Sequence, residues 1–230
     1  MPDGLLELGE AMLAASTQRL EAVAQNVANS ATPGYKAQLS FEQTLADAAG
    51  AAHRTPNLAQ GTLQRTGAPL DLALAGPGFF ALRDGETITY TRSAQFERDA
   101  NGRVVDAAGR VLQAVGGGDI VVSRADPEIL SDGVILEDGL PQAAIAVFDI
   151  DDANSLQSIG GAHFSAPDGA MAAIEANVRQ GMLESSNVDT AHEVLQMMTA
   201  IRQAETGARV VQTYDALISQ SITTLGRSAR

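Results

Sequence analysis

The residue types that most often carry out chemistry are few and scattered in this chain of 230 residues. Its three histidines are His53, His163 and His192, and none lies at the short spacing from another ligand that a metal site needs. We interpret them as loop or helix-surface residues, with a catalytic base assembled by folding as the alternative. The chain has no cysteine, which excludes thiol catalysis, disulfide bonds and cysteine-ligated metals.

Three other motifs fall short of the chemistry that they resemble. The glycine triplet at residues 116–118 lacks the following Lys-Ser/Thr of a phosphate-binding loop, so a turn is the better interpretation. In the acidic run that begins at Asp149, Asn154 stands where a calcium loop requires glycine. The serine pair at residues 185–186 has no flanking glycines of a nucleophile elbow. We therefore predict that the protein is not an enzyme and that it has no catalytic residue, cofactor or metal site.

The charge of the chain argues against several classes of partner. Its formal net charge is −13, and its 15 lysines and arginines form no basic run. Because nucleic acids and anionic membranes are bound through clustered basic residues, we predict neither as a partner. No stretch approaches the roughly 18 apolar residues of a membrane span, and residues 1–29 lack the charged and apolar regions of a cleaved secretory signal. We expect a protein that stays in the cytosol or is exported without signal cleavage.

Two long segments, one at each end of the chain, carry a heptad pattern. Between residues 194 and 225, core-type residues alternate at three- and four-residue spacing for more than four heptads. This pattern predicts a helix about 48 Å long with a narrow apolar seam. Such a seam needs another helix to cover it, from this chain or from a neighbour. Asn187 or Asp189 is expected to cap the N-terminal end of the predicted helix. The seam consists of Val194, Met197, Ile201, Ala204, Ala208, Val211, Asp215, Ile218, Ile222 and Leu225.

Residues 4–29 carry a second, lighter heptad pattern in which leucine or valine recurs every seven residues. This predicted helix should end near Ser30, because Pro33 disfavours a helical conformation before it and Gly34 can turn the chain. Two heptad patterns at opposite ends of the chain predict that the terminal helices pair. Asp215, the polar member of the seam, then sets the register, with a contact between subunits as the alternative. The recurring N-terminal residues are Leu6, Leu13, Leu20 and Val27.

Between the helices the periodicity becomes that of strands. From residue 67, short apolar or alternating runs are separated by glycine turns, and Asp84-Gly85 and Asn101-Gly102 are hairpin signals. No helical pattern interrupts these runs, which predicts an inserted all-β antiparallel domain. The predicted fold class is therefore α+β, with the terminal helices pairing as a coiled-coil layer. Its segments are the N-terminal helix and turn motif (1–36), a connector with a possible short helix over 41–52 (37–66), the β-rich domain (67–180) and the C-terminal heptad helix (181–230).

Two motifs at opposite ends of the chain resemble one protein family. Residues 26–36, Asn-Val-Ala-Asn-Ser-Ala-Thr-Pro-Gly-Tyr-Lys, are similar to the N-terminal signature of bacterial flagellar rod and hook proteins. Residues 181–189, Gly-Met-Leu-Glu-Ser-Ser-Asn-Val-Asp, followed by Glu193, are similar to the C-terminal signature of that family. Four blocks between them resemble the central part of the rod branch, at residues 66–73, 76–80, 90–93 and 132–133.

The resemblance implies a structural subunit of the flagellar basal-body rod, the helical tube that transmits motor torque across the periplasm to the hook and filament. It implies that the terminal helices form the inner layer of the tube and that the subunit leaves through the flagellar type III export apparatus without a cleaved signal. The implied partners are other copies of the chain, other proximal and distal rod proteins, and that apparatus, with no small-molecule substrate. The residues assigned to assembly are Asn26, Val27, Ala28, Asn29, Thr32, Pro33, Gly34, Tyr35, Leu183, Glu184, Ser186, Asn187, Val188 and Asp189, with Val194, Met197, Ile201, Val211, Asp215, Ile218, Ile222 and Leu225 along the seam.

Within the family, the chain length and the Thr-Gly-x-Pro-Leu-Asp block are most similar to the proximal rod protein of the F type, with the distal rod protein as the alternative. Two positions depart from the family pattern: Gln25 stands where a second asparagine is frequent, and Ala204 stands where an aromatic residue commonly precedes glutamate.

An alternative from another class is a soluble β-rich binding module that trimerises through its C-terminal coil. Such a module would keep its ligand affinity after removal of residues 1–30, whereas a rod subunit would lose assembly.

Overall fold

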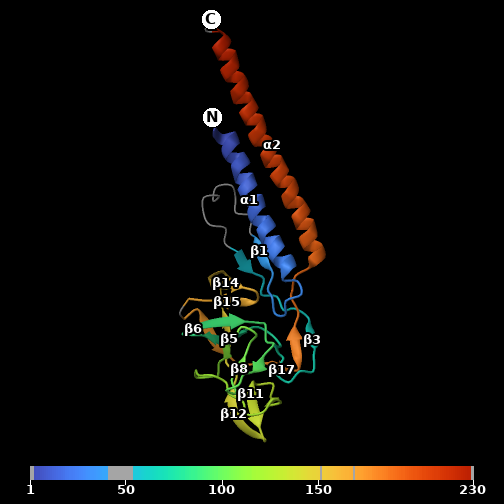
Figure 1. Cartoon of the computed structure of the whole chain (residues 1–230), viewed down its shortest axis with the longest axis vertical. Helices are drawn as coiled ribbons and strands as arrows, with labels where there is room; N and C mark the ends of the chain where they lie inside the picture. The colour runs from blue at the N-terminus through green and yellow to red at the C-terminus, as the bar shows by residue number, and fades with distance from the viewer. Residues whose placement is uncertain (1–2, 41–53, 151, 168, 229–230) are drawn as a thin grey trace. The chain divides into compact units, whose positions relative to one another are not determined.

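The computed structural model describes residues 3–40, 54–150, 152–167 and 169–228, and its fold is α+β (Figure 1). The chain forms two compact units. A helical unit contains residues 1–27, 38–54 and 189–230, and a β-rich unit contains residues 28–37 and 55–188. The short helix expected within residues 41–52 lies outside the described residues.

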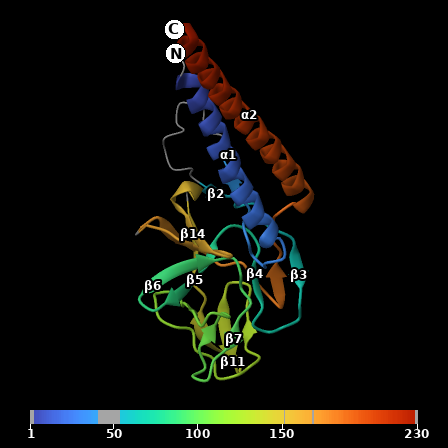
Figure 2. The same cartoon turned by 45° about the horizontal axis from the view of Figure 1, so that its top comes forward.

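Two helices make up most of the helical unit. α1 spans Asp3–Ala28 and α2 spans Thr190–Ser228, so the predicted helices at both ends of the chain are confirmed. They lie side by side and run in opposite directions (Figures 1 and 2). Asp189 caps α2, because its Oδ1 accepts hydrogen bonds from the backbone N–H groups of Ala191 (3.0 Å) and His192 (3.2 Å). Over the residues that are described, neither helix is long and apolar enough to cross a membrane.

Among the described residues the remaining elements are short strands and one 3₁₀ turn, as expected for a chain with glycine turns at close intervals. Their bounds are β1 (Gln38–Ser40), β2 (Arg54–Pro56), β3 (Leu63–Arg65), β4 (Leu72–Leu74), β5 (Phe79–Asp84), β6 (Thr87–Thr91), β7 (Glu97–Arg98), β8 (Val104–Val105), β9 (Val111–Leu112), β10 (Glu128–Ile129), β11 (Val134–Glu137), β12 (Leu140–Ala144), β13 (Val147–Ile150), η1 (Ala153–Ser155), β14 (Gln157–Gly160), β15 (His163–Ser165), β16 (Met171–Ile174), β17 (Val178–Gln180) and β18 (Met182–Glu184).

The sheets of the β-rich unit are antiparallel, which confirms that part of the prediction. The largest sheet runs in the order β14-β15-β6-β5-β9-β8-β7, and β13 pairs with both β5 and β16. Both hairpin signals are confirmed: Asp84 pairs with Thr87 across Gly85, and Arg98 pairs with Val104 around a turn that contains Gly102. The two glycines have φ angles of +62° and +83°, a region that glycine adopts readily.

The core of the β-rich unit lies between these sheets. One cluster contains Phe80, Leu82 and Leu112, all fully buried, and a second contains Phe79 and Phe164. The rings of Phe79 and Phe164 meet edge to face with centroids 5.7 Å apart, a favoured geometry for aromatic pairs. The scarcity of aromatic residues, 4% of the chain, is therefore compatible with a packed core.

The connector expected from the sequence, residues 37–66, contains the strands β1, β2 and β3. β3 pairs with β18, so that Leu63 lies opposite Glu184. Residues 63–65 show no alternation of apolar and polar side chains, and their partner strand lies far along the chain. Local periodicity therefore could not reveal this pairing, which joins the connector to the C-terminal motif.

Candidate assembly site

The two helices of the helical unit approach each other closely at a pair of glycines, Gly9 and Gly207. A Cβ atom on Gly207 would lie 3.1 Å from the carbonyl oxygen of Gly9 and 3.2 Å from Cγ of Leu13. A Cβ atom on Gly9 would lie 2.9 Å from Cγ2 of Val211. The absence of a side chain at both positions lets the two backbones come close together.

The side of α2 that faces α1 differs in register from the predicted seam. Glu193, Ala200 and Gly207 are buried, whereas Val194 and Ile201 are 50% and 43% exposed. The physical reason is the close contact between Gly9 and Gly207, which we name the glycine crossing. It brings the side of α2 that carries Gly207 to the α1 backbone, and not the side that carries Val194. In the second row of the seam Met197, Ala204 and Val211 are half-buried, as is Ala208 of the first row.

The C-terminal part of the seam is exposed where the structure describes it. Asp215 is exposed and Ile218 is 40% exposed, so neither is covered by α1. The side chains of Ile222 and Leu225 lie outside the described residues. A register-setting role for Asp215 within the α1–α2 pair therefore has no contact to support it among the described residues.

Asn26, from the N-terminal motif, holds the end of α1 in a buried hydrogen-bond network. Its Oδ1 accepts from the backbone N–H of Gln38 (2.8 Å), and its Nδ2 donates to the carbonyl of Gln38 (3.0 Å) and to Oε1 of Glu193 (2.9 Å). Asn26 is 2% exposed, so an amide is well suited because it donates and accepts at the same time. The network links α1 to β1 and to the first turn of α2.

The turn after α1 is held by its own residues and by the β-rich unit to which it belongs. Thr32 donates from its backbone N–H to the carbonyl of Asn29 (3.0 Å) and from Oγ1 to Asn29 Oδ1 (3.2 Å). Gly34, which was expected to turn the chain, has a φ angle of +69°, a left-handed conformation that glycine adopts readily. A Cβ atom on Gly34 would lie 2.3 Å from the backbone of Arg92 and Ser93, so only glycine fits.

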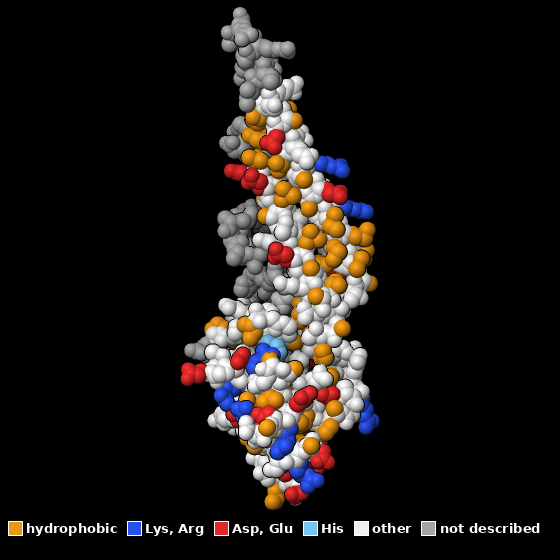
Figure 3. Space-filling view, in the orientation of Figure 1, with side chains coloured by type: hydrophobic (Ala, Val, Ile, Leu, Met, Phe, Trp, Pro, Cys, Tyr) orange, Lys and Arg blue, Asp and Glu red, His pale blue; other side chains and the backbone are white. Residues whose placement is uncertain are grey.

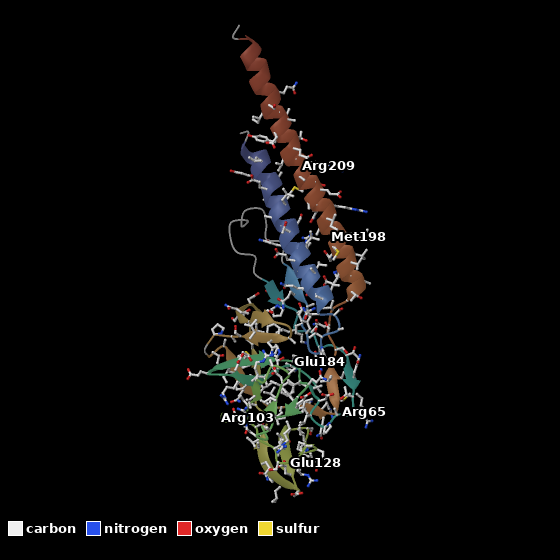
Figure 4. All side chains as sticks on the ribbon, viewed as in Figure 1. Arg65, Arg103, Glu128, Glu184, Met198 and Arg209 are labelled. Carbon is white, nitrogen blue, oxygen red and sulfur yellow. The ribbon has the colours of Figure 1, made fainter. Side chains whose placement is uncertain are left out.

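The two terminal motifs meet at a buried ion cluster, which we name the terminal clasp: Lys36, Arg92 and Glu184 (Glu184 is labelled in Figure 4). Glu184 Oε1 accepts from Lys36 Nζ (2.7 Å) and from the backbone N–H of Gly61 (2.8 Å), and its Oε2 accepts from Arg92 (3.2 Å). Lys36 Nζ also donates to the carbonyl of Ala59 (2.7 Å). The side chains of Lys36, Arg92 and Glu184 are 1%, 4% and 1% exposed, so the pairs are almost completely removed from water.

Burial and pairing act in opposite directions on the charges of the terminal clasp. Burial lowers the pKa of Lys36 and of Arg92, and the Glu184 carboxylate opposes this shift in both. Arg92 also donates to the carbonyl of Gly76 (2.7 Å) and lies 5.5 Å above the ring of Phe79, which favours its charged form further. The terminal clasp is stable only when all three charged side chains are present, because an unpaired buried charge is very unfavourable.

Asn187, from the C-terminal motif, forms a second link between the two motifs. Its Oδ1 accepts from the backbone N–H of Ala37 (2.7 Å), and its Nδ2 donates to the carbonyls of Asn57 and Ala59 (both 2.8 Å). Its own backbone N–H donates to the carbonyl of Tyr35 (3.3 Å). Asn187 was one of two predicted caps of the C-terminal helix; the cap is Asp189, and Asn187 instead joins two non-strand segments of the β-rich unit, residues 35–37 and 57–59.

The other residues of the two motifs have less specific surroundings. Tyr35 is buried, with 3% of its surface exposed, whereas Val27 and Ala28 at the end of α1 are exposed. Ser186 Oγ accepts from the backbone N–H of Val188 (3.3 Å). The half-buried members are Asn29, Thr32, Pro33, Leu183, Ser186 and Val188.

Reasoning from the sequence missed the partners of Glu184. Lys36 and Arg92 stand in blocks that resemble the family, but nothing in their spacing points to an ion cluster. One signal was available: Lys36 is the only lysine in a chain whose other 14 basic residues are arginines. A unique residue type next to a turn motif is a reason to expect a specific contact.

A separate polar cluster of the β-rich unit contains Asp106, Arg110 and His163. Arg110 contacts His163 Nε2 at 2.6 Å, and because a guanidinium can only donate, the neutral ring must carry its proton on Nδ1. Burial, and then the Arg110 charge, lower the pKa of His163 to about 4, while Asp106 opposes the shift. Protonation of the His163 ring would place a second positive charge next to the Arg110 guanidinium.

The free energy of unfolding of the β-rich unit is therefore expected to decrease as the pH falls from 6.5 toward 4. Over that interval the unfolded chain binds a proton at His163 and the folded chain does not, so the loss is about 1–2 kcal/mol by pH 5. Urea unfolding followed by circular dichroism at several pH values measures it. The His163→Gln variant should show a flatter profile between pH 7 and pH 4.5; an unchanged profile would contradict this role of the histidine.

Two ranges of the chain match known protein families. Residues 73–144 match the flagellar hook protein FlgE/F/G D1 domain, and residues 179–224 match the C-terminal region of the flagellar basal body rod FlgEFG proteins. The first match lies within the β-rich unit, and the second runs from β17 through most of α2. The chain belongs to the family of flagellar rod and hook proteins.

Individual relatives are similar to the chain over most of its length. It is 26% identical to the flagellar basal-body rod protein FlgF of Rhizobium meliloti (strain 1021) over 224 residues, which cover 92% of this chain and 93% of the relative. It is also 26% identical to FlgF of Caulobacter vibrioides over 245 residues, with 98% and 99% coverage. The flagellar basal-body rod protein FlgG of Bacillus subtilis (strain 168) is 28% identical over 243 residues, with 89% and 92% coverage. Identity alone therefore does not separate the F type from the G type.

Proposed function

We propose that this chain is a structural subunit of the flagellar basal-body rod, in the proximal position of the F type. The observation that supports this most is on α2, which is paired with α1 and still carries large exposed apolar side chains along its length. A monomeric protein rarely leaves such a surface open, because apolar area exposed to water is unfavourable. In this proposal α1 and α2 pair as a coiled-coil layer, and neighbouring subunits cover the remaining apolar surface of α2.

The proposal extends to location and partners. The subunit is placed in the basal body, where it contacts further copies of itself and other rod proteins. It reaches that place through the flagellar type III export apparatus. The distal rod protein is the second candidate, because the FlgG of Bacillus subtilis is as similar to this chain as the FlgF relatives are.

Deletion of the gene tests the function and separates the two candidates. Basal bodies from the deletion strain are imaged by electron cryotomography, and the last structure completed is recorded. A proximal subunit predicts that assembly stops before the distal rod, with no hook or filament. A completed proximal rod would favour the distal protein instead, and a complete rod with normal swimming would contradict the function.

The Ile218→Asp variant should prevent incorporation into the rod while leaving the stability of the free chain about the same. Ile218 is 40% exposed in the single chain, so a carboxylate there is solvated until a neighbour covers it. The measurement combines swimming on soft agar with the melting temperature of the purified protein. Ile218→Val serves as the matched control and should assemble. A decrease of several degrees in the melting temperature of Ile218→Asp would contradict this assignment.

A further inference from the structure

The β-rich unit contains the same six-residue pattern twice, with one residue different. Residues 99–104 read Asp-Ala-Asn-Gly-Arg-Val, and residues 106–111 read Asp-Ala-Ala-Gly-Arg-Val. Each copy forms a turn that leads into a strand, β8 after the first and β9 after the second. Figure 3 shows acidic and basic side chains among one another over the visible face of this unit, and Figure 4 labels Arg103 of the first turn. We name the two the 99–103 turn and the 106–110 turn.

The two turns are closed by the same hydrogen bonds. In the first, Asp99 Oδ1 accepts from the backbone N–H groups of Asn101 and Arg103 (both 2.8 Å). The N–H of Gly102 donates to the Asp99 carbonyl (3.0 Å), and Arg103 Nε donates to Asp99 Oδ2 (2.8 Å). The 106–110 turn has the same bonds between the corresponding residues, which are Asp106, Ala108, Gly109 and Arg110.

The two turns differ in what covers their glycine. Gly102 is buried, and its carbonyl accepts from the backbone N–H of Val122 (2.7 Å). A Cβ atom on Gly102 would lie 2.9 Å from the Val122 carbonyl oxygen. Gly109 is exposed, and a Cβ atom there would meet nothing within 4 Å beyond its chain neighbours. Gly102 is therefore held by its own turn and by Val122, whereas the described contacts of Gly109 come from its own turn.

Asn101-Gly102 is the only Asn-Gly pair of the chain, and Asn101 is exposed. In such a pair the glycine nitrogen, once a hydroxide ion has taken its proton, attacks Cγ of the asparagine. A bond forms between that nitrogen and Cγ, the Cγ–Nδ2 bond breaks, and the leaving nitrogen takes up a proton and departs as ammonia. Water then opens the succinimide ring at one of its two carbonyls, which leaves aspartate or isoaspartate. Glycine favours the attack because it has no side chain to obstruct its nitrogen.

The folded 99–103 turn opposes this attack. The proton that Gly102 must lose is donated to the Asp99 carbonyl, so that hydrogen bond has to break first. Asn101 is the third residue of this turn, where ψ is typically near 0°, and closing the succinimide ring needs a large rotation away from that value. The rotation would also displace Gly102 from Val122, which holds its carbonyl. The reaction therefore requires the turn to open.

We propose that Asn101 is a deamidation site of the unfolded chain, and that the folded β-rich unit suppresses the reaction by holding Gly102 between its own turn and Val122. This inference does not depend on the proposed rod function, because it follows from contacts within the β-rich unit. Isoaspartate adds one carbon to the backbone of the turn, so Asp99 cannot keep all of its bonds there. A chain that stays unfolded for long therefore loses the residue spacing that closes the 99–103 turn.

The rate of modification in the folded and the unfolded chain tests the proposal. The purified full-length protein is incubated at mildly alkaline pH and 37 °C, with and without urea, and the peptide that contains Asn101 is followed by mass spectrometry. We expect deamidation to be at least about tenfold faster in urea, which corresponds to a free energy of about 1.4 kcal/mol for opening the turn. Asn101→Gln is the control, because the six-membered ring that glutamine must form closes more slowly. Equal rates in the two states, or no modification in urea, would overturn the inference.

The 106–110 turn provides a matched variant for the role of Val122. Ala108→Asn creates a second Asn-Gly pair at an exposed position, in a turn with the same hydrogen bonds and an uncovered glycine. In the folded variant the introduced asparagine should be modified several times faster than Asn101, and in urea the two rates should be similar. Equal rates in the folded variant would show that Val122 does not protect Asn101.

Hydrogen exchange of the parent protein makes the same comparison without a substitution. The N–H of Gly102 should exchange more slowly than the N–H of Gly109, because the two donate to equivalent carbonyls and differ in their cover. If the Ala108→Asn chain does not fold, as judged by its urea unfolding curve, this measurement decides. Exchange of Gly102 as fast as that of Gly109 would overturn the assignment of the protection to Val122.

Discussion

The Glu184→Ala variant is expected to lose most of the stability of the β-rich unit. Removing this carboxylate leaves Lys36 and Arg92 as two buried cations without an anion, together with an unpaired backbone N–H at Gly61. Breaking a buried ion pair in this way costs about 3–5 kcal/mol, a large share of the roughly 5–15 kcal/mol that stabilises a typical domain. Urea unfolding followed by circular dichroism measures the loss, and we expect the variant to be largely unfolded at 37 °C.

Two companion variants show whether the charge imbalance is responsible. Lys36→Met removes one cation and leaves Glu184 paired with Arg92, so it should be clearly less destabilising than Glu184→Ala. Glu128→Ala removes an exposed carboxylate from β10 and should change the free energy of unfolding by less than about 0.5 kcal/mol. Equal effects of Glu184→Ala and Glu128→Ala would contradict the clasp as a source of stability.

The chemistry of Lys36 offers an independent measurement of the same contact. As the only lysine of the chain, with 1% of its side chain exposed, it should react slowly with an amine-reactive ester in the folded protein. In Glu184→Ala the modification of Lys36 should become as fast as in urea. Rapid modification of the parent protein under native conditions would show that the clasp is open.

The parts of the fold that follow from local pattern could be predicted from the sequence. Heptad spacing marks both terminal helices, and the Asp84-Gly85 and Asn101-Gly102 pairs mark two hairpins, because each signal depends on residues close together in the chain. The position of Gly34 in a left-handed turn follows from the same kind of local argument. These features need no knowledge of which distant segments meet.

The features that were missed depend on distant segments. The pairing of β3 with β18 and the contact of Lys36 with Glu184 join residues far apart in sequence, and no periodicity reports such a meeting. The register of α2 was assigned by apolarity, which favours Val194 and Ile201. The structure instead turns Gly207 toward α1, because the closeness of two backbones depends on the smallest residues and not on the most apolar ones.

The Gly207→Leu variant is therefore expected to separate α1 from α2. The first added atom alone would lie 3.1 Å from the carbonyl oxygen of Gly9 and 3.3 Å from Cβ of Met12, and the rest of the leucine has no space at the crossing. Overpacking a well-fitted contact usually costs about 1–3 kcal/mol, and we expect at least the upper value because backbone cannot move aside like a flexible side chain. Spin labels on the two helices and pulsed electron spin resonance measure the separation.

Thr206→Leu is the matched control, because it places the same side chain on the neighbouring, exposed residue of α2. It should keep the parent distance between the helices, and its helix propensity should be slightly better than that of threonine. If both variants keep the parent distance and the same helical content by circular dichroism, the glycine crossing does not determine the pairing. If only Gly207→Leu separates the helices, the face that α2 presents to neighbours is set by where its glycine lies.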